Sequence, residues 1–417
     1  VIGSEGGAVR LIKENNKWTL LRNGEPYYIK GGHGIGDLEL LKEIGGNSVI
    51  AYHSEVSDSL LDAAHELGIS VSVVLDIKKA RFDHDYTDPK IIVPQRKWVK
   101  EFVQKYKDHP ALLFWIIGNE IHIMRRRNAT LWKEVDHLSK MIHDIDPGHL
   151  TTTTIASYPT KTLQPTQIRM FAPDLDFISL NIYEFAHRIK RERQNIVWGM
   201  DDDPYLVTEW AGQPYWMMPK TEWGAIIEPH SSSYQKTQEF VQNYLTIFER
   251  DPNYCFGGYV IYFGEKQERT HTTFSMLLHG EYCTQSIESV EYCWNGKITI
   301  NYCPRIKKAS LDYPSVDYAN YLPTDSLLTY NIEVVEPDSE PMAMAWEIME
   351  EGEYFRKFGG QYEENPETVA GQKEPFPYRN KIKFRTPEKE GAYRFFVYVY
   401  DTSGNAATAN MPFYTLK

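Results

Sequence analysis

Short apolar runs recur along the first two thirds of the chain and alternate with segments of helical period. We interpret eight of these runs as buried strands, the first ending at His33 and the others covering 47–52, 69–77, 112–118, 151–155, 177–183, 205–208 and 258–263. Helices are predicted between them over 37–44, 58–67, 95–106, 131–145 and 232–250. Near-continuous apolar runs are typical of parallel strands buried on both faces. Eight strands interleaved with helices over about 260 residues predict an α/β fold, the (β/α)8 TIM barrel.

Signals of a different kind flank the barrel. Asn23-Gly24, between apolar segments, predicts a β-hairpin before the first strand. Residues 265–302 show no helical period and are predicted to form an extended loop, and 304–321 to return along the barrel wall. Short strands separated by Pro, Gly and Asp clusters then follow over 328–335, 343–348, 381–385, 393–400 and 406–414. We therefore predict a barrel with its hairpin over 1–322 and an all-β immunoglobulin-like sandwich over 323–417.

Composition narrows the class of protein. The chain has 417 residues, of which 42% are hydrophobic and 24% charged, as in globular proteins. No apolar run approaches the roughly 20 residues that span a bilayer. A net charge of −12 argues against a partner held by phosphate contacts, so no nucleic acid is expected. Val1 opens the chain without a basic and apolar leader, which we interpret as a mature or trimmed chain whose export signal, if any, is missing. We expect a monomer in the periplasm, at the cell surface or outside the cell.

The four cysteines, Cys255, Cys283, Cys293 and Cys303, lie close together in the sequence. No pair has the C-x-x-C spacing of a zinc site. Two interpretations stay open: four reduced thiols, which we favour, or one or two disulfides that staple the loops after the last barrel strand.

Two glutamates follow buried strands. Glu120 ends the fourth predicted strand and Glu209 the seventh. The C-terminal strand ends of a barrel share one face, and strands four and seven oppose each other across it. Two carboxyl groups about 5–5.5 Å apart can perform retaining glycoside hydrolysis, one as acid/base and one as nucleophile. Either glutamate alone would usually be only a strand end, so the prediction depends on the pair.

The residues Trp115-Ile-Ile-Gly-Asn119-Glu120, with Thr208-Glu209-Trp210 downstream, resemble a clan of retaining glycoside hydrolases. The surrounding sequence, for example residues 61–68 and 108–113, is similar to family 2-like barrel proteins and related bacterial β-glucanases. The resemblance covers about residues 25–310 and implies a (β/α)8 barrel with catalytic glutamates on strands four and seven.

Carried over by position, the resemblance implies that Glu120 is the acid/base and Glu209 the nucleophile. It implies that Asn119 hydrogen-bonds the sugar 2-hydroxyl and that Tyr183 holds Glu209 in its reactive orientation. One departure is that Tyr262-Phe263 stand where the clan usually has a tryptophan after strand eight. Phe263 is then the candidate for stacking on the sugar.

Other residues near predicted strand ends are candidate sugar contacts: His53, Asp76, His122, Trp210, Trp216, Trp223 and Glu265. For each histidine and for Asp76 a structural hydrogen bond is at least as plausible, and at least one tryptophan is expected in the core. His33 and His53 are weak zinc candidates because H-E-x-x-H spacing is absent, so no metal or cofactor is predicted. The basic runs 125–127 and 190–193 are either solvated helix faces or contacts to an anionic polysaccharide.

These observations favour a retaining glycoside hydrolase acting on a β-linked oligosaccharide or polysaccharide, with β-glucan, possibly β-1,3-linked, as the leading substrate. A transglycosylase would use the same residues with a sugar as acceptor. A non-catalytic carbohydrate-binding barrel would be expected to lack one of the two carboxylates. A metal-dependent sugar isomerase would need a cluster of His and carboxylate ligands at the strand ends.

Overall fold

The computed structural model describes the whole chain except residues 83, 123–127, 157–162, 184–185, 191–201, 229–231, 315–319 and 353–362. The described residues form two compact units. The first contains Val1–Trp210 and Asn243–Ile261, and the second contains Ala211–Gln242 and Tyr262–Lys417. The domain boundary at residue 322 stays a prediction.

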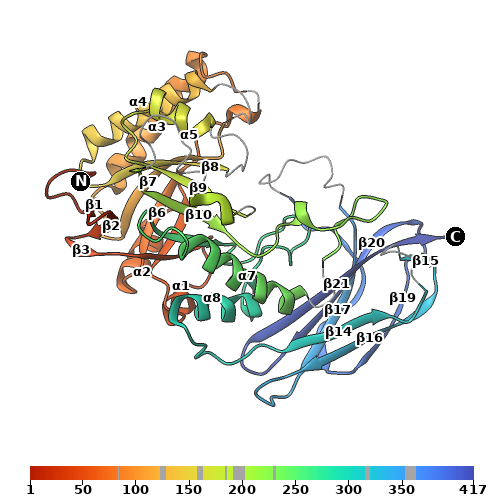
Figure 1. Cartoon of the computed structure of the whole chain (residues 1–417). Coiled ribbons are helices and arrows are strands. Elements are labelled where there is room, and N and C mark those ends of the chain that lie inside the picture. Colours follow the sequence, from red (N-terminus) through yellow and green to blue (C-terminus); the bar gives the residue numbers. More distant parts are fainter. Residues whose placement is uncertain are drawn as a thin grey trace. The chain divides into compact units, whose positions relative to one another are not determined.

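The first unit is a closed barrel of eight parallel strands in the order β10-β11-β4-β5-β6-β7-β8-β9 (Figure 1). The strands are β4 (Ile29–His33), β5 (Ser48–Tyr52), β6 (Ser70–Leu75), β7 (Leu112–Asn119), β8 (Leu150–Ala156), β9 (Phe177–Asn181), β10 (Tyr205–Trp210) and β11 (Cys255–Ile261). Each of the eight predicted apolar runs contributes one strand, so the predicted TIM barrel is confirmed.

Helices connect the strands as the alternation predicts. They are α1 (Leu38–Glu43), α2 (Asp58–Glu66), α3 (Pro89–Tyr106), α4 (Ala129–Ile145), α5 (Leu163–Phe171) and α7 (Ser232–Phe248), with short 3-10 turns at Ala80–Phe82, Ala186–Arg188 and Tyr215–Met217. Side chains fix the helix starts: Asp37 accepts from the Leu40 amide and Ser57 from the Leu60 amide. Gly68 ends α2 in the left-handed conformation, with φ of 72°.

A small sheet of β1 (Val9–Glu14), β2 (Lys17–Arg22) and β3 (Glu25–Pro26) precedes the barrel. The predicted turn at Asn23-Gly24 is present, and both residues have the positive φ that such a turn requires. Val9, Leu11 and Leu20 share one apolar cluster with barrel residues including Leu113 and Leu150. The sheet therefore covers the end of the barrel where the strands begin.

The second unit contains two β-sheets. A seven-stranded sheet has the order β12-β13-β21-β20-β17-β18, with β15 paired to β21, and a three-stranded sheet has the order β14-β16-β19. The strands are β12 (Leu277–Leu278), β13 (Tyr282–Thr284), β14 (Arg305–Leu311), β15 (Tyr321–Pro323), β16 (Leu327–Val335), β17 (Ala343–Glu350), β18 (Thr368–Pro377), β19 (Lys381–Arg385), β20 (Gly391–Tyr400) and β21 (Asn405–Leu416). The five strands predicted after residue 327 are all present.

The alternation of side chains on β20 explains how this unit packs. Phe395 and Val397 join a core that also contains Tyr330 and Phe384 of the three-stranded sheet. Their neighbours Phe396 and Tyr398 point to the opposite face and join a second apolar cluster. The large sheet is thus buried on both faces of β20. The immunoglobulin-like character of this unit stays a prediction.

One expectation for the segment after β11 is wrong, because residues 265–302 contain helix α8 (Gln285–Asn295). Residues 304–321 supply β14, which pairs with β16, and their predicted course along the barrel wall stays a prediction. The apolar stripe of α8 is narrow, formed by Ile287, Val290 and Trp294, and its other buried side chains are polar, among them Gln285, Glu288 and Glu291. Hydrogen bonds replace apolar packing: Glu291 accepts from the amide and hydroxyl of Thr299.

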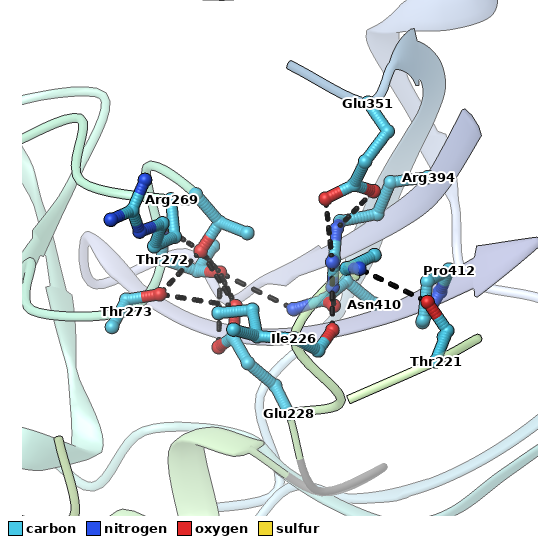
Figure 2. A network of polar contacts seen from close by, with 12 residues as sticks. Thr221, Ile226, Glu228, Arg269, Thr272, Thr273, Glu351, Arg394, Asn410 and Pro412 are labelled. Atoms are coloured by element: carbon cyan, nitrogen blue, oxygen red, sulfur yellow. Dashed lines mark hydrogen bonds and ion pairs between the residues drawn. The ribbon is translucent and has the colours of Figure 1, made fainter. Parts of the chain in front are cut away.

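A buried polar network ties loops of the second unit to its large sheet (Figure 2). Arg394 on β20 pairs with Glu351, donates to Asn410 on β21, and donates to the Ile226 carbonyl in the segment after β10. The carboxylate of Glu228, in the same segment, accepts from the hydroxyls of Thr270 and Thr272. The Asn410 amide donates to Thr272 and joins the two halves. The segments after β10 and β11 are thereby fixed within their unit.

Two of the cysteines are buried free thiols. The Cys255 thiol donates to the Gly257 carbonyl, and the Cys303 thiol donates to the Cys283 carbonyl. Burial raises the pKa of both thiols, that of Cys255 to about 12. A raised pKa keeps a thiol protonated and chemically inert.

Candidate active site

Polar side chains gather at the C-terminal ends of the barrel strands, the face where TIM barrels carry their chemistry. They include His33 at the end of β4, Tyr52 at the end of β5, Asn119 at the end of β7 with Glu120 after it, Asn181 at the end of β9 with Tyr183 after it, and Thr208 and Glu209 on β10. Most of these side chains are buried although they are polar, so their hydrogen bonds define the site.

Glu209 is 8% exposed and each of its carboxylate oxygens has a donor. The amide of Asn119 donates to Oε1 at 3.1 Å, and the Tyr183 hydroxyl donates to Oε2 at 2.6 Å. His33 Nδ1 lies 3.6 Å from Oε1. These contacts fix the rotation of the carboxylate, as a residue that orients Glu209 would do. The catalytic and orienting roles themselves stay predictions.

Glu120 follows β7 in an unusual backbone conformation. Its φ is 50° and that of Gly118 is 75°, both in the left-handed region. A Cβ at Gly118 would lie 2.5 Å from a methyl group of Ile121, so only glycine fits there. Glu120 itself, which is not glycine, bears a cost of about 1–3 kcal/mol that surrounding contacts must offset. Its amide donates to the Thr154 carbonyl at 3.0 Å, which anchors the turn.

Two asparagine side chains join the two glutamates. Asn181 donates to Glu120 Oε1 at 2.9 Å and to Asn119 Oδ1 at 3.1 Å, while Asn119 donates to Glu209. The Thr208 hydroxyl donates to Asn181 Oδ1 at 2.9 Å and fixes the orientation of that amide. The structure thus brings the two predicted carboxylates into one hydrogen-bonded line.

Asn181 and Tyr52 were not among the predicted site residues. Asn181 lies inside a run that predicts a strand, and only its polar character within that apolar run marks it. The Tyr52 side chain is half-buried, and its hydroxyl accepts a hydrogen bond from the Asn119 amide at 3.1 Å. Desolvation, and then the charge of Glu209, raise the pKa of Tyr52, so its hydroxyl stays protonated.

His53 and Asp76 lie at the next strand ends. The His53 ring stacks on Trp98 at a centroid distance of 4.5 Å, and its Nδ1 accepts from the Asp76 amide at 3.3 Å. Desolvation lowers the pKa of His53. The Asp76 carboxylate is exposed and lies 4.0 Å from Lys79 Nζ. Both side chains belong to the barrel face that carries the glutamates.

Two other candidates in this unit are buried. His122 is 2% exposed and its ring packs against Trp132. Trp210 has no exposed area and packs against Tyr244 and Phe248. Its position in the core leaves no ring face for a sugar, which agrees with the expectation that one of the tryptophans is structural.

The remaining candidates belong to the second unit. Phe263 is fully buried, so its ring offers no face to solvent. Trp216 is 44% exposed and its ring is flanked by Tyr215. Trp223 packs beside Tyr321, and Glu265 is an exposed residue whose pKa is raised by partial desolvation. Of these side chains, Trp216 has the most accessible apolar surface for stacking.

The predicted basic runs 125–127 and 190–193 lie outside the described residues, except Lys190. Within the described part of the chain, no group of three or more His, Cys, Asp or Glu side chains is placed to hold a metal ion. Among the helices that the structure describes, none combines the length and apolar character that crossing a bilayer requires.

The sequence-family model described as glycosyl hydrolases family 2, TIM barrel domain, matches residues 33–296 of this chain. This match covers more than half of the chain, from the first barrel strand to the end of α8. The chain therefore belongs to glycosyl hydrolase family 2.

Individual relatives share low sequence identity with this chain. A probable mannan endo-1,4-beta-mannosidase C of Aspergillus terreus is 27% identical over 163 residues, covering 32% of this chain and 39% of that protein. A beta-glucuronidase of Streptococcus agalactiae is 24% identical over 266 residues, covering 52% of this chain and 43% of that protein. The crystal structure of Bacteroides uniformis beta-glucuronidase matches with a TM-score of 0.53 at 13% identity, covering 98% of this chain and 48% of that one. The chain thus spans less than half the length of these relatives.

Proposed function

We propose that this chain is the barrel-containing part of a retaining glycoside hydrolase that cleaves β-linked glycans by double displacement. Family membership supports the hydrolase class. The hydrogen-bonded line from Glu209 through Asn119 and Asn181 to Glu120 is the observation that supports these catalytic residues. Two carboxyl groups held at one end of a barrel can act on opposite sides of one glycosidic bond.

In this mechanism Glu209 attacks the anomeric carbon while Glu120 gives its proton to the glycosidic oxygen. The first step breaks the bond to the leaving sugar and forms a covalent glycosyl–enzyme bond. In the second step Glu120 takes a proton from water, which attacks the anomeric carbon and releases Glu209. Both glutamates end in their starting protonation states.

Asn119 and Tyr183 prepare Glu209 for attack. Each gives one hydrogen bond to a different carboxylate oxygen, so the carboxylate has one orientation before substrate arrives. The two side-chain N–H groups of Asn119 already donate hydrogen bonds to Glu209 and to the Tyr52 hydroxyl. A sugar 2-hydroxyl bound by Asn119 would therefore replace one of these partners, most simply the Tyr52 hydroxyl.

For the substrate we propose a β-glucan, with a β-1,3-linked glucan as the first candidate. The names of the matched relatives add β-1,4-mannan and β-glucuronides as alternatives to be tested. A transglycosylase would use the same glutamates with a sugar in place of water. The competing proposal of a non-catalytic binding barrel is disfavoured because both carboxylates are in place.

We further propose that the chain acts in the periplasm, at the cell surface or outside the cell, as a monomer, and that its second unit is an immunoglobulin-like brace. Polysaccharides are too large to enter cells intact, which is the reason for this placement. The two-sheet core around Tyr330 and Phe395 supports the brace.

The test is hydrolysis of a panel of β-glucans, β-mannan and aryl β-glycosides including a β-glucuronide. We expect release of reducing sugar from at least one of them. Glu209→Gln should reduce kcat by at least about 10⁴-fold because the nucleophile is lost, while the melting temperature stays near that of the wild type. The matched control is Glu39→Gln, at an exposed position on α1, which should keep full activity. Substantial turnover by Glu209→Gln would remove Glu209 from the nucleophile role.

A further inference from the structure

A groove of about 430 Å³ lies within the first unit, away from the two glutamates. Its wall comes from the β1–β3 sheet and from the loops that precede β7 and β8, and it includes Arg22, Lys107 to Pro110 and Asp146 to His149. The groove therefore belongs to the barrel end where strands begin. Leu112 at the groove starts the strand that ends at Asn119, so the two sites are on the order of 20 Å apart along β7.

The groove is preformed by hydrogen bonds in its wall. The Val9 amide donates to the Gly148 carbonyl, and the Asn23 amide donates to the Ala8 carbonyl. Its volume falls within the 300–1,000 Å³ that is usual for small-molecule sites. A rigid wall reduces the ordering cost of binding.

Arg22 supplies donors at this groove. Its guanidinium lies over the Tyr27 ring and donates one hydrogen bond, at 2.9 Å, to the Pro110 carbonyl. A guanidinium has five N–H groups, so donors remain for a ligand carboxylate. Lys107 adds a second positive charge, which Asp108 neutralises at 3.1 Å.

His149 supplies a different group. It is 8% exposed, and its Nδ1 lies 2.9 Å from Asp146 Oδ2. Burial opposes the charge of Asp146, but the hydrogen bonds from His149, Trp115 and Gly148 outweigh it and lower the pKa of Asp146. A carboxylate only accepts, so Nδ1 carries a proton toward Asp146, and Nε2 is left to hydrogen-bond a ligand hydroxyl, which can both donate and accept. Within the described residues, this Nε2 has no hydrogen-bond partner.

Asp146 and His109 use their polar atoms within the protein. The two oxygens of Asp146 accept from Gly148, His149 and the Trp115 indole. The two ring nitrogens of His109 contact the Ala111 amide and Asp62. Two groups of the groove can therefore bind a ligand: the Arg22 guanidinium can bind an oxyanion, and His149 Nε2 can form a hydrogen bond with a hydroxyl.

We propose that this groove binds a sugar acid, with the ligand carboxylate on Arg22 and a ring hydroxyl hydrogen-bonded to His149 Nε2. A simple carboxylate ligand would form no hydrogen bond with the His149 imidazole. A neutral sugar would give the Arg22 guanidinium no anionic partner. The groove is a binding site separate from the glycosidase centre and requires no catalytic step. It would hold an acidic residue of a glycan while the opposite face of the barrel remains open.

The Trp115 indole N–H is a reporter for this groove because it donates to Asp146 Oδ2 at 2.8 Å. In ¹⁵N-tryptophan-labelled protein, its signal is assigned with Trp115→Phe and followed during titration with glucuronate, glucose and acetate. We expect a saturable shift with glucuronate, with a Kd in the millimolar range, and binding at least about tenfold weaker for glucose and for acetate.

Arg22→Gln should weaken glucuronate binding at least tenfold, and Arg10→Gln on the neighbouring strand β1 should leave it unchanged. Glu209→Gln should also leave the Trp115 shift unchanged, which separates this groove from the catalytic centre. The proposal is overturned if glucuronate causes no saturable shift, if glucose or acetate binds as well as glucuronate, or if Arg22→Gln binds like the wild type.

Discussion

At the scale of single residues, the site depends on side-chain amides. Asn181 contacts Asn119 and Glu120 and receives a bond from Thr208, so it connects the strand ends of β7, β9 and β10. Neither glutamate is positioned by charge partners alone. The Glu120 carboxylate therefore depends directly on the Asn181 amide, and the Glu209 carboxylate depends on it through Asn119.

Asn181→Ala tests this dependence. The substitution removes the donor to the Glu120 carboxylate, and a hydrogen bond to a charged group contributes about 1.5–3 kcal/mol. We expect kcat to fall about 10- to 100-fold with little change in KM, because the change affects positioning of the reacting groups. Asn331→Ala on β16 is the matched control and should keep wild-type kinetics. A large rise in KM at unchanged kcat would contradict a positioning role.

His271 in the second unit predicts a pH dependence of stability. It is 5% exposed, and burial lowers its pKa to about 4, with His279 and Arg394 acting in the same direction against Glu347 and Glu228. The unfolded chain then binds more protons than the folded chain between about pH 6.5 and 4. The contribution of the neutral His271 to the free energy of unfolding is fully present above about pH 6.5. It is lost as the pH falls from about 6.5 to about 4.

Urea unfolding at pH 7.5 and 5 measures the effect. The wild type should lose about 2 kcal/mol more than His271→Gln over this interval, since one pKa unit corresponds to about 1.4 kcal/mol. His65→Gln, an exposed histidine on α2, is the control and should lose stability like the wild type. Equal losses in wild type and His271→Gln would show that His271 does not titrate in this way.

At the scale of elements, the apolar runs predicted the barrel well because its parallel strands are buried on both faces. Apolar periodicity did not predict α8, because its buried side chains include the polar residues Gln285, Glu288 and Glu291. Periodicity detects apolar burial, whereas Glu288 and Glu291 are buried as hydrogen-bond acceptors of Cys303 and Thr299. The edge strand β18 was also missed, because nearly all its residues are exposed or half-exposed and carry no alternating pattern.

The same reasoning explains which site residues were predictable. Glu120 and Glu209 are charged residues directly after apolar strands and therefore stand out in the sequence. Asn181 and Tyr52 are single polar residues within strands, and only the three-dimensional hydrogen bonds identify them. The burial of Trp210 against α7 depends on a contact that the sequence alone does not specify.

The Arg394–Glu351 pair tests the element-level account of the second unit. Both side chains are nearly buried, at 2% and 8% exposure, and Arg394 also holds the Ile226 carbonyl. Removing one partner of a buried pair leaves an uncompensated charge, so Arg394→Ala should cost about 3–5 kcal/mol in the free energy of unfolding.

Arg385→Ala is the control, because the Arg385–Asp325 pair is 59% exposed on each side and should contribute less than about 1 kcal/mol. Both variants are compared by urea unfolding. A cost for Arg394→Ala as small as that for Arg385→Ala would contradict a structural role for the buried network.

At the scale of the whole molecule, the chain combines a barrel of glycosyl hydrolase family 2 with a β-rich second unit. It spans less than half the length of the relatives reported above. The barrel nevertheless contains both proposed catalytic carboxylates and the amides that join them. Its chemistry can therefore be tested on this chain.

The most direct test of the central claim is rescue of Glu120→Ala by azide on an aryl β-glycoside with a good leaving group. The substrate is the glycoside that the panel identifies. The leaving group needs no proton, so the glycosyl–enzyme forms, and azide replaces the water that Glu120 would have activated. The account predicts that azide raises kcat at least tenfold and yields a β-glycosyl azide. An unchanged rate without azide product, or full activity of Glu120→Ala without azide on a natural glycan, would contradict it.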